Sequence, residues 1–324
     1  MTLSFSKLGS PFKFEPDLVN GFAHALIADV GLSTDKVVYI EKDVWLTLML
    51  HELYSQENAS NELVFKGGTC LVKCYYGFFR FSEDLDFTWV GKKENDKINR
   101  RLFRRKYVDP MIHELQLGFE ETPEILKGVR HSQSGRLLNY FFVIERPGAS
   151  DMMKVKLNVS FIEPLLFPIE SIEIKPLHVS KGKKRELIGL FGPVAKEYFR
   201  SVIVSAYSKK EIACEKVRAL LTRKEKLNRS RDVVDLLYLS KDVDLKSAEI
   251  IDGCMNKLNV SLKIPAYKTV LKKRLLEVDT YLSHIVEYTK EEPIYISPID
   301  YGALRKFKDD TLKPLIEHLK KKLP

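Results

Sequence analysis

Apolar residues recur along the chain at two spacings, which predicts strands mixed with helices before about Ser205 and helices alone after it. The segment from Asp35 to Tyr54 carries two apolar stripes at helical spacing, so we expect a largely buried helix there. Its apolar residues include Trp45, Leu46, Leu48, Met49, Leu50 and Leu53. The change of pattern predicts a first domain of residues 1–204 and a helical second domain of residues 205–324.

A strand, a glycine turn, a helix and a second strand are expected to follow in that order. Leu63–Phe65 is a short apolar run that ends at the pair Gly67-Gly68. We expect Thr69 to cap the next helix and Gly77 to end it. The strand after this helix closes at Gly91.

The middle of the chain predicts one more helix and further strands. Residues 99–116 have the pattern of an amphipathic helix with a basic cluster. That cluster consists of Arg100, Arg101, Arg104, Arg105 and Lys106. Strands are expected at Leu137–Glu145 and at Met153–Phe161, where apolar and polar residues alternate. Strand-like pieces within Ile172–Val179 lead to the segment Lys181–Arg185, which we expect to be a charged loop.

The composition is that of a soluble globular protein, with 324 residues of which 44% are hydrophobic. No run approaches the roughly 20 apolar residues of a membrane span, and the start of the chain lacks a signal core. We therefore expect a cytoplasmic protein with no membrane partner. The net charge of +9 favours polyanionic partners only weakly, because solubility alone can explain it. Four scattered cysteines predict buried free thiols, not a disulfide framework.

Two carboxylates and a glycine pair are the most informative chemical features. Asp84 and Asp86 are two apart on an expected strand, so both point to the same face and can clamp a hard divalent cation. Gly67 and Gly68 open a helix, where backbone N–H groups suit phosphate oxygens. Taken singly, an Asp-x-Asp is more often a solvated strand face, and a glycine pair is more often an ordinary turn. Their order and spacing together indicate chemistry on a magnesium-bound nucleotide.

This order of elements resembles the nucleotidyltransferase superfamily of DNA polymerase β, in which a glycine turn grips the triphosphate and paired aspartates hold metal ions. Several segments carry a closer resemblance to the AbiEii/AbiGii toxin family of nucleotidyltransferases. They are Glu41–Trp45, Lys66–Lys73, Arg80–Phe87, Glu215–Leu220 and Arg231–Leu236. The resemblance implies an α+β fold, in which a polymerase β-like mixed sheet with flanking helices precedes a C-terminal helical domain.

Two sets of site residues follow from the local chemistry and from this resemblance. The catalytic set is Asp84, Asp86, Lys216 and Asp232, of which the first two would ligate Mg²⁺ or Mn²⁺. The nucleotide-binding set is Gly67, Gly68, Thr69, Lys73, Arg80 and Ser82. Structural alternatives stay open for Lys216, as the solvated flank of a helix, and for Asp232, as an acid in the first turn of a helix. Asp235 is expected on the same helix face as Asp232 and could share its role.

The sequence departs from the superfamily at the third carboxylate, which polymerase-like enzymes commonly carry on a neighbouring strand. The segment where we would look for it offers Asn158, which is a neutral ligand at best and cannot act as a general base. Glu145 and Glu163 stay open as substitutes. Glu83 should point away from the two aspartates, and we expect a structural role for it.

The reaction implied by the resemblance is nucleotidyl transfer, in which an acceptor hydroxyl attacks the α-phosphorus of an NTP and pyrophosphate leaves. The family implies a toxin of a toxin–antitoxin or phage-defence pair, which a cognate antitoxin counters, and some relatives modify the acceptor end of tRNA. The arginines within residues 100–105 are compatible with an RNA acceptor and equally with a solvated helix face. Two alternatives stay open: transfer onto a protein or small molecule, and a non-catalytic nucleotide- or RNA-binding module with a degenerate site.

Overall fold

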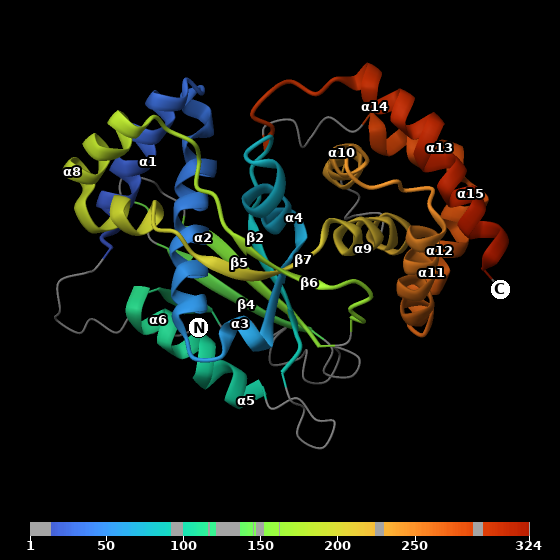
Figure 1. Cartoon of the computed structure of the whole chain (residues 1–324), viewed down its shortest axis with the longest axis horizontal. Coiled ribbons are helices and arrows are strands. Elements are labelled where there is room, and N and C mark those ends of the chain that lie inside the picture. The colour runs from blue at the N-terminus through green and yellow to red at the C-terminus, as the bar shows by residue number, and fades with distance from the viewer. Residues whose placement is uncertain are drawn as a thin grey trace. The chain divides into compact units, whose positions relative to one another are not determined.

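The protein is a mixed α+β chain that divides into two compact units (Figure 1). The first unit spans Met1–Ile162 and Ser171–Ala206, and the second spans Glu163–Glu170 and Tyr207–Pro324. The computed structural model describes residues 14–91, 100–115, 117–120, 137–144, 146, 152–161, 163–223, 230–287 and 294–323.

A seven-stranded mixed sheet runs through the first unit, with its strands in the order β3-β4-β5-β2-β1-β7-β6. The strands are β1 (Leu63–Lys66), β2 (Asp84–Trp89), β3 (Gly118–Glu120), β4 (Leu137–Ile144), β5 (Met153–Ser160), β6 (Ile169–Glu173) and β7 (Ile203–Tyr207). β2 pairs with β1 antiparallel and with β5 parallel, and β1 pairs with β7 parallel. The strand that carries the two aspartates therefore has a hydrogen-bonded neighbour on each side.

Apolar residues on alternate positions of the central strands form the core of this unit. Phe65 and Phe87 lie directly opposite each other on β1 and β2, with ring centroids 5.3 Å apart. Both side chains are fully buried, as is Leu85. Because side chains alternate along a strand, this register places the residues between them on the opposite face of the sheet. The predicted strands at residues 63–65 and around Asp84 are confirmed.

Helices of the first unit flank the sheet (Figure 1). They are α1 (Pro16–Val30), η1 (Thr34–Lys36), α2 (Val37–Ser55), α3 (Ala59–Glu62), α4 (Gly67–Cys70), η2 (Leu71–Tyr76), α5 (Arg100–Phe103), η3 (Arg104–Val108), α6 (Asp109–Leu115) and α8 (Lys181–Tyr198). The largely buried helix predicted at residues 35–54 is confirmed as α2. α1 and α8, which the apolar pattern did not reveal, pack with α2 and with each other.

Two local predictions were wrong. Thr69 does not cap a helix, because the helix already begins at Gly67 and Lys66 occupies the cap position. Residues 181–185 are not a loop but the first turns of α8. The Ser180 hydroxyl accepts a hydrogen bond from the Lys183 N–H at 3.2 Å, which satisfies one of the free donors at this helix start.

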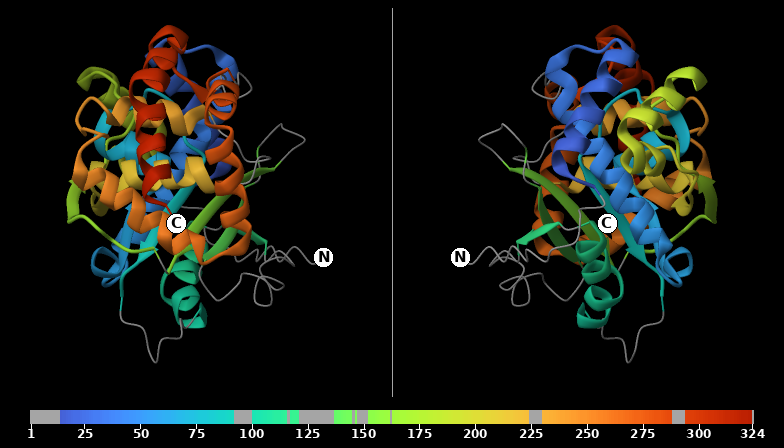
Figure 2. Two further views of the ribbon diagram at one scale, coloured as in Figure 1. Left: turned by 90° about the vertical axis from the view of Figure 1, so that its right-hand side faces the viewer. Right: turned by 90° about the vertical axis from the view of Figure 1, so that its left-hand side faces the viewer.

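The second unit is built from helices that pack on one another (Figure 2). They are α9 (Lys209–Thr222), α10 (Ser230–Leu239), α11 (Ala248–Leu262), α12 (Pro265–Leu276), α13 (Val278–Val286), α14 (Tyr301–Phe307), η6 (Lys308–Leu312) and α15 (Lys313–Lys322). The four cysteines of the chain are buried thiols that form no disulfide, as predicted. Among the described residues, no helix is both long enough and apolar enough to cross a membrane.

Candidate active site

The glycine turn and the aspartate strand meet where β1 passes into α4. Gly67 has a φ of +80°, a left-handed value that side chains rarely adopt. A Cβ atom at this position would lie 2.5 Å from Asp86 Oδ2. Lys66 and Asp86 are paired in register on β1 and β2, which fixes this close approach. The carboxylate can therefore reach the backbone of the turn only because residue 67 is a glycine.

Three polar side chains hold the turn against the start of β2. The Thr69 hydroxyl donates to the Asp84 carbonyl at 2.5 Å and also lies 2.8 Å from the Ser82 hydroxyl. Arg80 is only 1% exposed, and its guanidinium occupies the space that a side chain at Gly68 would need. The structure thus brings together six residues predicted for nucleotide and metal binding around one turn, in addition to Asp86. A buried positive charge lies next to the turn where a triphosphate is expected.

The two aspartates lie on one face of β2 and are both half-buried, while Leu85 between them faces the core. On the neighbouring strand β5, Asn158 is in register with Asp86 and Lys156 with Asp84. The Asn158 side-chain amide donates a hydrogen bond of 2.7 Å to Asp86 Oδ1. Asn158 therefore lies directly beside the carboxylate, in the segment where the family resemblance led us to look for a third acid.

The residues present fit a hard divalent cation that also carries substrate oxygens. Mg²⁺ in nucleotide sites commonly takes one or two carboxylates and completes its shell with phosphate and water. The glycine turn leaves open the side of Asp86 where a Cβ would lie, and Asp86 Oδ2 faces that space. Within the described part of the chain, no three His, Cys, Asp or Glu residues form a ligand set. Asp84 and Asp86 would therefore hold the cation together with the substrate.

Lys73, which was predicted to bind the nucleotide, is engaged by α2. Its ammonium is 2.7 Å from Asp43 Oδ1 and donates to Thr47 Oγ1 at 2.8 Å. The whole side chain is buried. The lysine therefore ties the helical run after the glycine turn to α2. Glu83 also contacts α2, since its carboxylate lies 3.5 Å from the Lys42 ammonium.

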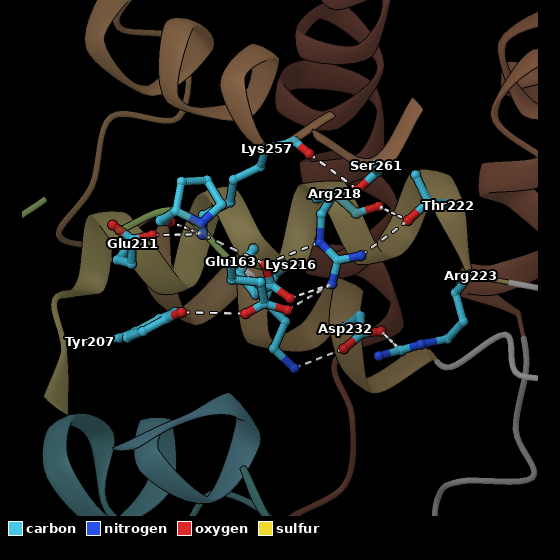
Figure 3. A network of polar contacts seen from close by, with 12 residues as sticks. Glu163, Tyr207, Glu211, Lys216, Arg218, Thr222, Arg223, Asp232, Lys257 and Ser261 are labelled. Atoms are coloured by element: carbon cyan, nitrogen blue, oxygen red, sulfur yellow. Dashed lines mark hydrogen bonds and ion pairs between the residues drawn. The ribbon is translucent and has the colours of Figure 1, made fainter. Parts of the chain in front are cut away.

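Lys216 and Asp232, the predicted C-terminal site residues, form an ion pair within the helical unit (Figure 3). The Lys216 ammonium lies 2.7 Å from Asp232 Oδ1 and 2.6 Å from Asp235 Oδ2. Arg223 also pairs with Asp232. Lys216, Asp232 and Asp235 are each less than 10% exposed. Lys216 is therefore not a solvated helix flank. Asp232 and Asp235 lie on the same face of α10, three residues apart.

The charges around Asp232 set its ionisation. Burial alone would raise the pKa of this carboxyl group. The positive charges of Arg223 and Lys216 outweigh that effect and hold its pKa well below the ordinary value. Asp232 is therefore a carboxylate at neutral pH, and it can keep the Lys216 ammonium oriented.

A second buried network in the helical unit was missed by the sequence reasoning (Figure 3). Lys257 on α11 is 1% exposed, and its ammonium lies 2.6 Å from Glu211 and 3.7 Å from Glu215. Burial alone would lower the pKa of Lys257, but these two carboxylates raise it above the ordinary value. Glu211 also accepts the backbone N–H groups of Leu166 and Phe167. The only signal in the sequence was the spacing of the two glutamates, which places them on one helix face.

Glu163 and Glu145 are the two acids that the sequence left open as substitutes for a third carboxylate. Glu163 belongs to the helical unit, where its carboxylate accepts a hydrogen bond of 3.3 Å from the Tyr207 hydroxyl. It also lies 4.0 Å from the Arg218 guanidinium. Glu145 lies outside the described residues.

A mixed sheet that places a glycine turn against paired aspartates is the arrangement of a nucleotidyltransferase. Residues 49–291 match the family model described as "Nucleotidyl transferase AbiEii toxin, Type IV TA system". The chain therefore belongs to the AbiEii family of nucleotidyltransferase toxins of type IV toxin–antitoxin systems, which confirms the family predicted from the motifs. A search of curated proteins finds no match.

Two bacterial proteins are among the solved structures that match this chain. The structure titled MenT4, a nucleotidyltransferase toxin from Mycobacterium tuberculosis H37Rv, is 16% identical, with a TM-score of 0.57. The match covers 96% of this chain and 91% of that chain. JHP933 from Helicobacter pylori is 13% identical, with coverage of 90% and 96% and a TM-score of 0.46. At this identity, the likeness to MenT4 supports the α+β fold alone.

Replacing Gly67 with alanine should separate backbone strain from damage to the site. Gly67→Ala is expected to lower transfer by at least about a hundredfold, because the new Cβ displaces the Asp86 carboxylate. Gly31→Ala is the matched control, since Gly31 has a φ of +67° and open space around its missing Cβ. Both variants should lose about 1 kcal/mol of stability in urea unfolding, but only Gly67→Ala should lose activity. Equal activity in the two variants would contradict a role for the close approach.

Proposed function

We propose that this chain transfers an NMP from an NTP onto an acceptor hydroxyl and releases pyrophosphate, with Mg²⁺ or Mn²⁺ bound at Asp84 and Asp86. The observation that carries the proposal is the contact between the Asp86 carboxylate and the left-handed glycine turn. It puts a cation-binding group next to the backbone of a helix start, where phosphate oxygens are favoured. A nucleoside triphosphate with its divalent cation requires a cation-binding carboxylate and a phosphate-binding helix start side by side.

The chain's own residues would act mainly by alignment and charge neutralisation. The backbone at Gly67 and Gly68 is open to close approach by phosphate oxygens. The nearby guanidinium of Arg80 adds positive charge, and the Thr69 hydroxyl fixes the turn to β2 through the Asp84 carbonyl and also contacts Ser82. A cation held by the aspartates would supply further charge neutralisation at the triphosphate.

The acceptor that the family resemblance and the net charge of +9 support is RNA, in particular tRNA. In the predicted arginine cluster, Arg104 is paired with Asp109 at 2.9 Å, while Arg105 is exposed. The family's toxin–antitoxin setting supports a cognate antitoxin protein as the natural partner. We place the reaction in the cytoplasm, where NTPs and RNA are both present.

The direct test incubates the full chain with Mg²⁺, each of the four α-labelled NTPs in turn, and total RNA. Label should appear on one size class of RNA, should require the divalent cation, and should disappear in Asp84→Ala. Label on protein or on a small molecule would instead support the alternative acceptors. The Glu83→Gln variant is the matched control, because it removes a neighbouring acid that is paired with Lys42.

A non-catalytic binding module is the second candidate function, and the observation that favours it is Asn158 in the place of a third acid. A degenerate site of this kind would bind an NTP without transferring any part of it. Binding of NTP by calorimetry, combined with no label on any acceptor, would support the module over the enzyme.

A further inference from the structure

The side of the aspartate pair that faces β5 carries no negative charge among the described strand residues. Asp86 has Asn158 opposite it on β5, and Asn158 in turn has Asn139 opposite it on β4. Asp84 has Lys156 opposite it. Because residues paired in register share a face of the sheet, these side chains lie on the same face as the two aspartates. The aspartates are therefore bordered here by two amides and one ammonium.

The two oxygens of Asp86 have different surroundings. Oδ1 accepts the hydrogen bond from the Asn158 amide at 2.7 Å. Oδ2 faces the glycine turn, 2.5 Å from the point where a Cβ of Gly67 would lie. An N–H donor repels a cation, so the oxygen next to Asn158 is the poorer cation ligand. The oxygen towards the turn is the one placed to share a cation with a bound phosphate.

A second divalent cation on the β5 side would have few ligands. Enzymes with two metals place them about 4 Å apart, and each hard divalent cation needs oxygen ligands such as carboxylates. Here it would meet the Asn158 amide and the Lys156 ammonium instead of a third carboxylate. Lys156 is half-buried, its ammonium lies 5.8 Å from the Phe141 ring, and it makes no ion pair within the described part of the chain. Its charge is thus available on the face that the aspartates occupy.

We propose that the site binds a single divalent cation, on the side of the glycine turn, and that Lys156 and Asn158 stand where a second cation and its carboxylate would be. The proposal rests on the nucleotidyl transfer proposed above. Lys156, opposite Asp84 in register, adds positive charge to this face of the sheet, and Asn158 positions Asp86 by holding Oδ1. The acceptor hydroxyl would then approach over amide groups and a lysine instead of a metal-bound carboxylate.

The test counts bound Mn²⁺ by electron paramagnetic resonance, using the full chain saturated with an NTP analogue whose α,β-bridge cannot be cleaved. The wild-type chain is expected to bind a single Mn²⁺ ion in the presence of the analogue. Asn158→Asp should gain a second, weaker ion, because it adds a third carboxylate next to Asp86. Asn139→Asp is the matched control, since it adds the same charge to the same row but one strand farther away, and it should still bind a single ion.

The outcomes separate this inference from the proposed function. Two Mn²⁺ ions on the wild-type chain would overturn the single-cation site and leave the proposed function standing, and this holds even if a variant fails to fold. No analogue-dependent Mn²⁺ binding at all would overturn both. An Asn158→Asp variant that is folded by thermal unfolding and still binds a single ion would show that Asn158 does not set the number of cations.

Discussion

Asp86→Asn is expected to lower the rate of nucleotidyl transfer by about a thousandfold or more, on the scale of removing a group that stabilises charge in the transition state. The substitution keeps the size of the side chain and an oxygen that can accept the hydrogen bond from Asn158. It removes only the negative charge that would hold the cation. Asp84→Asn should have a similar effect, because both carboxylates lie on the same face of β2. The measurement is single-turnover transfer of labelled NMP with saturating NTP and Mg²⁺.

Two comparisons distinguish the loss of a cation-binding charge from a general loss of structure. Urea unfolding of Asp86→Asn should agree with the wild-type value to within about 1 kcal/mol, because the substitution keeps the size of the side chain and the hydrogen bond from Asn158. Glu83→Gln should retain most of the activity, because Glu83 contacts Lys42 of α2 and follows the opposite strand parity. Similar losses for Glu83→Gln and Asp86→Asn would mean that net charge, not a cation site, governs the rate.

The parts of the site that the sequence predicted depend on short stretches of chain. Two aspartates two positions apart must share a strand face, and a glycine pair between a strand and a helix must form a tight turn. The order of strand, turn, helix and strand then brings these features together, because adjacent strands in sequence often pair. The contact between Gly67 and Asp86 follows from this local order.

The parts that the sequence did not predict depend on pairings between distant segments. Lys73 is four residues past Thr69, and local spacing suggested phosphate binding, but the lysine is held by Asp43 on a separate helix. The Lys257 network needs three segments to meet, and no spacing within one segment specifies that. The third miss is local instead: the segment 181–185 has the composition of a loop, yet the cap by the adjacent Ser180 starts a helix there. A charged surface helix and a charged loop differ little in composition, and only the cap separates them.

Lys216→Met is expected to destabilise the protein by about 3–5 kcal/mol at pH 7, the scale of breaking a buried ion pair by removing one partner. The ammonium lies within 2.7 Å of both Asp232 and Asp235, and all three groups are buried. The pKa of Asp232 is lowered in the folded state, so its contribution to stability is present above the ordinary carboxyl pKa of about 4 and is lost as the pH falls below it. Urea unfolding at pH 7 and pH 3 should show a smaller pH effect for Lys216→Met than for the wild type.

The control is Lys209→Met, which makes the same change on the same helix at an exposed pair. The Lys209 ammonium lies 2.6 Å from Asp242, but both side chains are about a third or more exposed, so the loss should stay below about 1 kcal/mol. Transfer by the folded fraction of Lys216→Met then tests the catalytic role that the family resemblance implies. We expect a loss of about a hundredfold beyond the loss of folded protein. Unchanged transfer by the folded variant would assign Lys216 to the stability of the helical unit alone.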